Sequence, residues 1–86
     1  MNDMNDIRIL ATYRTSDLYY AAYLKVAGVP FEGTTREENR VFFIFNEEED
    51  TQNMRDLKQQ FFSGRAKVSA LDYKQSIQMM KSLTHL

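Results

Sequence analysis

The sequence predicts an α+β fold, a small split βαβ-like sheet with three helices packed on it. Runs of alternating polar and apolar residues indicate strands, and apolar residues spaced three and four apart indicate helices. The order along the chain is strand, helix, strand, strand, helix, an optional very short strand and helix (β-α-β-β-α-(β)-α). This is the order expected of a split βαβ sheet with helices packed against it.

The first strand and the first helix occupy the N-terminal third of the chain. The run IRILATYR, residues 7–14, alternates and predicts a strand. The following TSDLYYAAYLKVAGVP offers Thr15 or Ser16 as the helix cap and Gly28 as the left-handed stop, with Pro30 beyond it. Apolar and aromatic residues reach nearly all round this helix, which predicts that it is buried at the centre of the fold.

A hairpin follows in FEGTTREENRVFFIF. Its two strand-like runs flank residues 37–39, and Asn39 can take the positive φ that closes a three-residue loop. This loop predicts Arg36 opposite Arg40. Alternation then places Val41, Phe43 and Phe45 on the core face and Phe42 and Ile44 on the other face. A solvated face would not carry two such apolar residues, so we expect a cover there, for which the third helix is available.

Two amphipathic helices complete the predicted fold. The second has its apolar stripe at Met54, Leu57, Phe61 and Phe62, and the third at Ala70, Tyr73, Ile77, Met80 and Leu83. Asn46 with Glu49 forms a capping box for the second helix, which ends at Gly64, and Ser69 caps the third. The optional strand is RAKV, between these helices.

The chain has the size of one domain. We predict a single α+β domain over residues 7–84, a frayed tail over 1–6 and a short C-terminal tail over 85–86. With 86 residues, of which 43% are hydrophobic and 13% aromatic, it can form only a thin core. A partner surface or a second copy would therefore add materially to its stability.

Charge and cysteine content exclude several classes of function. Eleven basic and twelve acidic residues give a net charge of −1, so there is no global attraction to nucleic acid or anionic membranes. The lack of cysteine excludes disulfides, thiolate catalysis and cysteine-ligated metals. The N-terminal MNDMNDIRIL lacks signal-peptide features and no apolar run is long enough to cross a membrane, which predicts an unprocessed cytoplasmic protein.

No metal, cofactor, small-molecule substrate or catalytic site is predicted. Residues 47–50 are four consecutive acids, but they lack the alternating ligands and the glycine turn of a calcium loop. They are better interpreted as the first turn of the second helix, where carboxylates meet the positive end of the helix dipole. The sole histidine, His85, lies in the tail, and no nucleophile has a base in a known motif. We therefore expect a protein that is not an enzyme.

Two binding functions remain. A small interaction module that self-associates or binds a protein partner would cover the second sheet face, and its candidate surface consists of Phe42, Ile44, Arg36 and Arg40. The alternative is a domain that binds single-stranded nucleic acid, with the aromatic sheet face stacking bases. Its candidate basic patch consists of Arg65, Lys67, Lys74 and Lys81, a local positive excess that a solvated helix face explains more often than a binding patch does.

The sequence also resembles a known family over nearly its whole length. The recurring elements are the run TSDL at residues 15–18, the aromatic strand through Phe45, Phe61-Phe62 with Gly64, and Val68, Tyr73 and Lys81. With these elements the chain is similar to a small family of uncharacterised bacterial and phage-associated proteins, a domain of unknown function. The resemblance implies a shared fold and carries over no activity, catalytic residue or binding residue.

Overall fold

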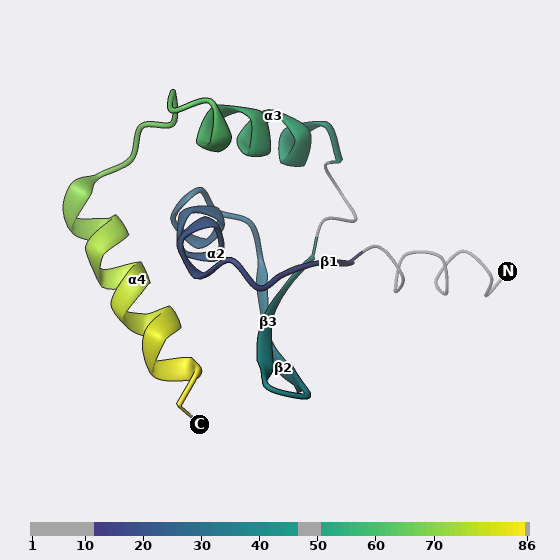
Figure 1. Cartoon of the computed structure of the whole chain (residues 1–86). Helices are drawn as coiled ribbons and strands as arrows, with labels where there is room; N and C mark the ends of the chain where they lie inside the picture. Colours follow the sequence, from purple (N-terminus) through teal and green to yellow (C-terminus); the bar gives the residue numbers. More distant parts are fainter. Residues whose placement is uncertain (1–11, 47–50, 86) are drawn as a thin grey trace, which may run out of the picture.

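The computed structural model describes residues 12–46 and 51–85 (Figure 1). Its elements are β1 Thr12–Thr15, α2 Leu18–Val26, β2 Phe31–Glu37, β3 Arg40–Asn46, α3 Thr51–Phe62 and α4 Ala70–Leu83. The predicted α+β class and the order of these elements are confirmed. Residues 65–69 form no strand, so the optional strand predicted there is absent from the described sheet.

The three described strands form one sheet in the order β1-β3-β2. β3 runs antiparallel to both neighbours, so β1 and β2 are parallel to each other and β3 lies between them. Because α2 connects β1 to β2, the arrangement is a βαβ unit split by a third strand. The strand predicted from residue 7 is described from Thr12 onward, and its earlier residues lie outside the described part.

The helix α2 is the centre of the fold. Five consecutive residues, Tyr20 to Leu24, are at most 5% exposed, and the ring of Tyr20 lies 5.0–6.4 Å from the rings of Tyr13, Tyr23, Phe61 and Phe62. Five buried residues in a row cover every side of a helix, since 3.6 residues make one turn. This confirms the prediction that the helix is buried at the centre of the fold, which was made from the apolar residues on nearly all of its sides.

The start of α2 is capped by a side chain. At the start, the carboxylate of Asp17 accepts hydrogen bonds from the backbone N–H groups of Tyr19 and Tyr20, both at 3.1 Å, so the cap is Asp17. The predicted caps Thr15 and Ser16 are therefore wrong, because Thr15 still belongs to β1. A carboxylate at this position also favours the positive end of the helix dipole.

The end of α2 follows the prediction. Gly28 has φ +95°, and its N–H donates to the carbonyl of Lys25 at 3.1 Å. The N–H of Val29 donates to the carbonyl of Leu24, also at 3.1 Å, which completes a Schellman ending. Gly64, at φ +79°, ends α3 with the same pattern of hydrogen bonds.

The third helix of the prediction, α4, packs on α2 rather than on the sheet. Figure 1 shows α2 nearly end-on between the sheet and α4, with α3 across the top. The hydroxyl of Ser76 donates to the carbonyl of Ala22 at 2.9 Å, and that of Tyr73 donates to the carbonyl of Tyr19 at 3.1 Å. The third helix was one available cover for Phe42, but α4 lies against α2 instead, because a helix that is apolar all round offers it a second face to bury.

The hairpin has a tighter turn than predicted. Glu37 pairs with Arg40, so the turn has two residues, Glu38 and Asn39, and Glu38 has the positive φ of +59° that was predicted for Asn39. Arg36 consequently lies opposite Val41 and not opposite Arg40. The predicted register is therefore wrong by one residue at the tip of the hairpin.

A bulge restores the predicted register at the base of the hairpin. Gly33 pairs with Ile44 and Phe31 pairs with Phe45, which leaves Glu32 as an extra residue in β2. Gly33 has φ +124°, a conformation that glycine adopts at little cost, and glycine is common at such bulges. The shift at the turn and the shift at the bulge cancel, so Phe31 still faces the core beside Phe45.

The junction between β3 and α3 lies partly outside the described residues. Asn46 is the last residue of β3, where its N–H donates to the carbonyl of Pro30 at 2.9 Å. The described part of α3 begins at Thr51. Residues 47–50, the acidic run interpreted as the opening turn of this helix, lie outside the described residues.

Candidate functional site

The side of the sheet that faces away from α2 is the candidate site. Along β3, Phe43 and Phe45 point toward α2 and are 1% and 0% exposed, whereas Phe42 and Ile44 point the other way and are half-buried. We call this second side the outer face; its members are Arg14, Thr35, Glu37, Arg40, Phe42 and Ile44. The register of the two strand pairs places these residues together.

Two charged side chains meet across the centre of the outer face. Arg14 in β1 donates two hydrogen bonds to the carboxylate of Glu37 in β2, at 2.8 and 2.9 Å. Because β3 lies between these strands, the Arg14 side chain has to cross it. Its guanidinium carbon lies 3.9 Å from the centre of the Phe42 ring, the geometry of a cation–π contact. Arg14 and Glu37 therefore form a polar cover over Phe42.

The same contact shifts both pKa values. The hydrogen bonds from Arg14 lower the pKa of Glu37 below its ordinary value, although burial works in the opposite direction. The pKa of Arg14 is raised, chiefly by its hydrogen bonds to Glu37. Both side chains remain about half exposed, at 47% and 50%, so solvent and salt screen the ion pair.

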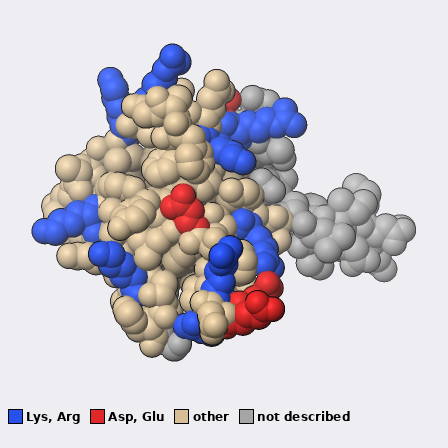
Figure 2. All heavy atoms as spheres, in the orientation of Figure 1, with Lys and Arg blue, Asp and Glu red and all other residues tan. Residues whose placement is uncertain are grey.

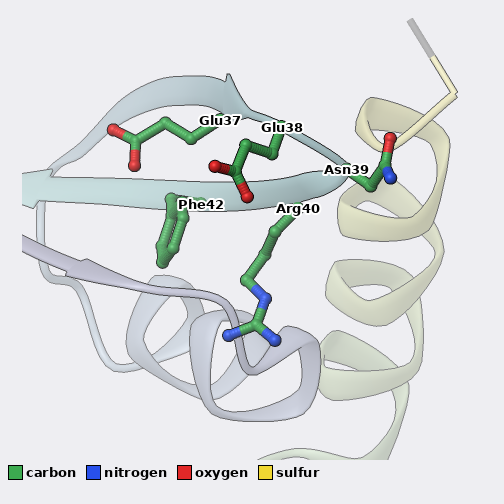
Figure 3. Close-up of a pocket in the computed structure, with 5 residues that line it drawn as sticks. All are labelled: Glu37, Glu38, Asn39, Arg40 and Phe42. Atoms are coloured by element: carbon green, nitrogen blue, oxygen red, sulfur yellow. The ribbon is translucent and has the colours of Figure 1, made fainter.

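A hollow of about 470 Å³ lies on this face at the tip of the hairpin. Figure 3 shows its lining: Glu37, Glu38, Asn39, Arg40 and Phe42. In that view Arg40 and Phe42 extend in the same direction from β3, while Asn39 points away from them. The hollow thus offers carboxylates, one guanidinium and an aromatic ring, which can bind a partner but do not form a nucleophile–base pair.

The structure separates one of the four residues predicted for the interaction surface. Phe42, Ile44 and Arg40 share the outer face, but Arg36 lies on the inner side, opposite Val41. There its guanidinium donates a hydrogen bond to the carbonyl of Thr84 at 3.0 Å. The one-residue shift at the turn is the reason, because a shift of one residue moves a side chain to the other face of a sheet.

The residues of the predicted basic patch are all exposed. Arg65 and Lys67 lie in the connection between α3 and α4, and Lys74 and Lys81 lie seven residues apart on α4. Figure 2 shows Lys and Arg side chains scattered over the face in view rather than gathered in one place. His85, the sole histidine, is exposed as well.

Sequence reasoning missed Arg14 and Glu37. Both sit at strand positions that alternation assigns to a face, so a signal existed for each residue separately. Their meeting depends on β3 being the central strand and on the exact turn length, neither of which periodicity reveals. The third member of the contact, Phe42, is one of the candidate surface residues named from the sequence.

Residues 12–46 and 51–85 contain no cluster of three or more histidine, aspartate or glutamate side chains that could hold a metal ion. Within the same ranges, every helix is too short or too polar to cross a membrane.

Comparison with known proteins identifies a family without adding an activity. No curated protein and no solved structure matches the chain. A family profile matches residues 10–85, which is nearly all of the sequence and includes every described strand and helix from β1 to α4. The chain therefore belongs to the family described as a domain of unknown function (DUF5659).

Proposed function

We propose that this domain is a non-catalytic interaction module that self-associates through its outer face. The observation that carries the proposal is the position of Phe42 and Ile44 opposite α2. In the described part of the chain α2 and α4 lie on one side of the sheet, and α3 crosses above it (Figure 1). Phe42 and Ile44 are thus on a face where the side chains of Arg14 and Glu37, and not a helix, provide the cover. A second copy of the chain would bury these two residues more fully.

The charges of the outer face favour a second copy as the partner. Arg14 and Arg40 lie on the same face as Glu37, and the bulge residue Glu32 is close enough for its carboxylate to accept from Asn46 at 3.4 Å. A two-fold axis sets a surface against itself, so a surface with both signs can pair its own charges. A surface of one sign would repel its copy.

The size of the outer face predicts weak association. The two seven-residue strands β2 and β3 are about 23 Å long, the four-residue β1 is about 13 Å long, and each strand is about 4.7 Å wide, which gives an area of roughly 280 Å². Stable interfaces bury about 800 Å² on each partner. We therefore expect a concentration-dependent dimer rather than a permanent one.

The single-stranded nucleic-acid alternative has less support. The one large ring on the outer face, Phe42, already carries the Arg14 guanidinium, and Glu37 neutralises that charge. A base would have to displace this contact in order to stack. Scattered basic side chains do not supply the groove that follows a phosphate backbone.

The resemblance to bacterial and phage-associated proteins, together with the lack of cysteine, supports a place for this module in the bacterial cytoplasm. This location is part of the proposal. It is consistent with an interaction that depends on surface side chains rather than on disulfides.

Sedimentation of the full chain over a concentration series tests the proposed function. We expect a monomer–dimer equilibrium, and we expect the double variant Phe42→Thr/Ile44→Thr to weaken it at least about tenfold. Threonine keeps the β-propensity of both positions. The matched control is Leu71→Gln, which removes an apolar side chain that is 60% exposed on α4.

Circular dichroism of each variant shows whether the fold is retained. A monomer at every concentration, or equal association of the folded double variant and the wild type, would overturn self-association through this face. A folded Leu71→Gln variant that also loses the dimer would place the interface on α4 instead.

A further inference from the structure

A second hollow lies on the inner side of the hairpin tip. Its volume is about 560 Å³, within the range of about 300–1,000 Å³ that is usual for ligand sites. The lining comes from three places: the hairpin (Arg36, Asn39, Arg40, Val41 and Phe43), the entry to α2 (Ser16 before its cap and Leu18, its first residue) and the C-cap of α4 (Thr84). The fold thus brings three distant segments to one opening.

The hollow carries positive charge that the described residues do not balance. Arg36 donates a single hydrogen bond, to the carbonyl of Thr84, and so keeps several of its five N–H donors. The Arg40 side chain makes no hydrogen bond or ion pair with residues 12–46 and 51–85. Its cross-strand neighbour Glu37 is already bound to Arg14. No acidic residue is among those that line the hollow in the described chain.

The floor of the hollow is apolar. Leu18 and Val41 are half-buried, and beneath them Phe43 is only 1% exposed. Ser16 and Asn39 add polar groups at the rim. Two guanidinium groups beside an apolar floor suit a ligand that has both a charged end and an apolar body.

We propose that this hollow binds a carboxylate that is carried on an apolar chain. Arg36 and Arg40 would donate paired N–H groups to the carboxylate, the planar geometry for which arginine is favoured over lysine. The apolar chain would lie on Leu18 and Val41. Such a group occurs at the end of a free aliphatic acid and at the C-terminus of a peptide with an apolar last residue.

The site can be tested separately from the proposed self-association through Arg36. Arg36 and the apolar floor lie on the inner side of the sheet, and Phe42 and Ile44 lie on the outer face. Arg40 lines both hollows, so Arg40→Gln can affect the dimer as well as the ligand. Arg36→Gln leaves the outer face as it is, and Phe42→Thr/Ile44→Thr leaves the lining of this hollow as it is, so these two variants separate failure of ligand binding from failure of the dimer.

Titration of the isotope-labelled full chain, followed by NMR, tests the proposal. Sodium octanoate is one probe, and a short acetylated peptide with a C-terminal leucine carboxylate is the other. We expect saturable shifts at the amides of Ser16, Asn39, Val41 and Thr84 with at least one probe, with octanol and the peptide amide as uncharged controls. Binding of octanoate alone indicates a free acid, and binding of the peptide alone indicates a chain terminus; both support the site.

Arginine variants decide whether the two guanidinium groups bind the carboxylate. Arg36→Gln and Arg40→Gln should each weaken binding about tenfold or more, whereas the control Arg65→Gln, which removes the same charge between α3 and α4, should not change it. The proposal is overturned if neither probe saturates up to about 10 mM, if the uncharged controls bind equally well, or if folded Arg36→Gln binds like the wild type.

Discussion

The two faces of β3 bury aromatic residues by different means. On the inner face, Phe43 and Phe45 are covered by α2, and almost none of their surface is exposed. On the outer face, Phe42 is covered by the crossing side chain of Arg14, which Glu37 holds in place. A helix excludes water from the rings it covers, whereas an exposed ion pair can move aside. Adjacent residues of one strand thus belong to the permanent core and to a partly exposed surface.

The largest difference between the faces should appear when a ring is removed. Phe43→Ala should cost about 3–5 kcal/mol of unfolding free energy, because it leaves a cavity against α2. Phe42→Ala removes a half-buried ring with water nearby and should cost about 1 kcal/mol. Urea unfolding followed by circular dichroism measures both.

A domain this small has a low free energy of unfolding, so Phe43→Ala could leave too little folded protein for an unfolding curve. Phe43→Leu keeps most of the volume and serves as the second inner variant, with a loss smaller than that of Phe43→Ala but larger than that of Phe42→Ala. Equal losses at the two faces would show that something covers Phe42 as thoroughly as α2 covers Phe43.

The features that the sequence predicts correctly are local ones. Alternation separates Phe43 from Phe42, and Gly28 and Gly64 mark the ends of two helices, because each signal depends on neighbouring residues alone. The sequence did not predict that α4 packs on α2, because the apolar stripe of a helix does not specify against which of two apolar surfaces the helix will pack. The Arg14–Glu37 contact needs both the strand order and the register.

The predicted and observed registers of the hairpin agree at its base and differ at its tip. A three-residue loop and a two-residue turn followed by a bulge place Phe31 opposite Phe45 equally well. They differ only between Gly33 and Glu37, where they exchange the faces of Arg36 and its neighbours. Of the four candidate residues, Phe42, Ile44 and Arg40 therefore share the outer face, and Arg36, which the shifted segment contains, lies on the inner face.

An intermediate effect should follow from changing the bulge that assigns side chains to faces. Gly33→Ala places a Cβ at φ +124°, where nothing lies within 4 Å, so the cost comes from the backbone rather than from a clash. We expect a loss of about 1–2 kcal/mol in the free energy of unfolding. The turn at Glu38 should hold the register at the hairpin tip, so the Arg14 side chain should keep its contact with Glu37.

Urea unfolding and the NMR signals of the Arg14 side chain measure the two parts of this prediction. Gly64→Ala is the matched control, since it strains a glycine at φ +79° that lies outside the sheet. Loss of the Arg14 contact in Gly33→Ala alone would mean that the bulge, and not the turn, sets the faces. If Gly33→Ala caused no loss of stability, the bulge would accept a side chain at this position without strain.

The smallest effect should come from acid. The pKa of Glu37 is lower in the folded chain than its ordinary value of 4.5. The stability that this carboxylate contributes is therefore fully present above that value and is lost as the pH falls through the folded-state pKa. Thermal unfolding of the wild type and of Glu37→Gln should differ at neutral pH, and the difference should disappear in acid. Raising the salt concentration should also shrink it, because the pair is exposed.

Glu38→Gln, one residue away in the turn, removes the same charge without touching Arg14 and serves as the control. Its unfolding curve should remain close to that of the wild type across the same pH range. If Glu38→Gln changed stability as much as Glu37→Gln, the effect would belong to the net charge of the hairpin and not to the contact over Phe42. If Glu37→Gln had no effect at any pH, the Arg14–Glu37 ion pair would contribute nothing to the free energy of unfolding. A partner could then displace Arg14 from Phe42 without losing a stabilising contact.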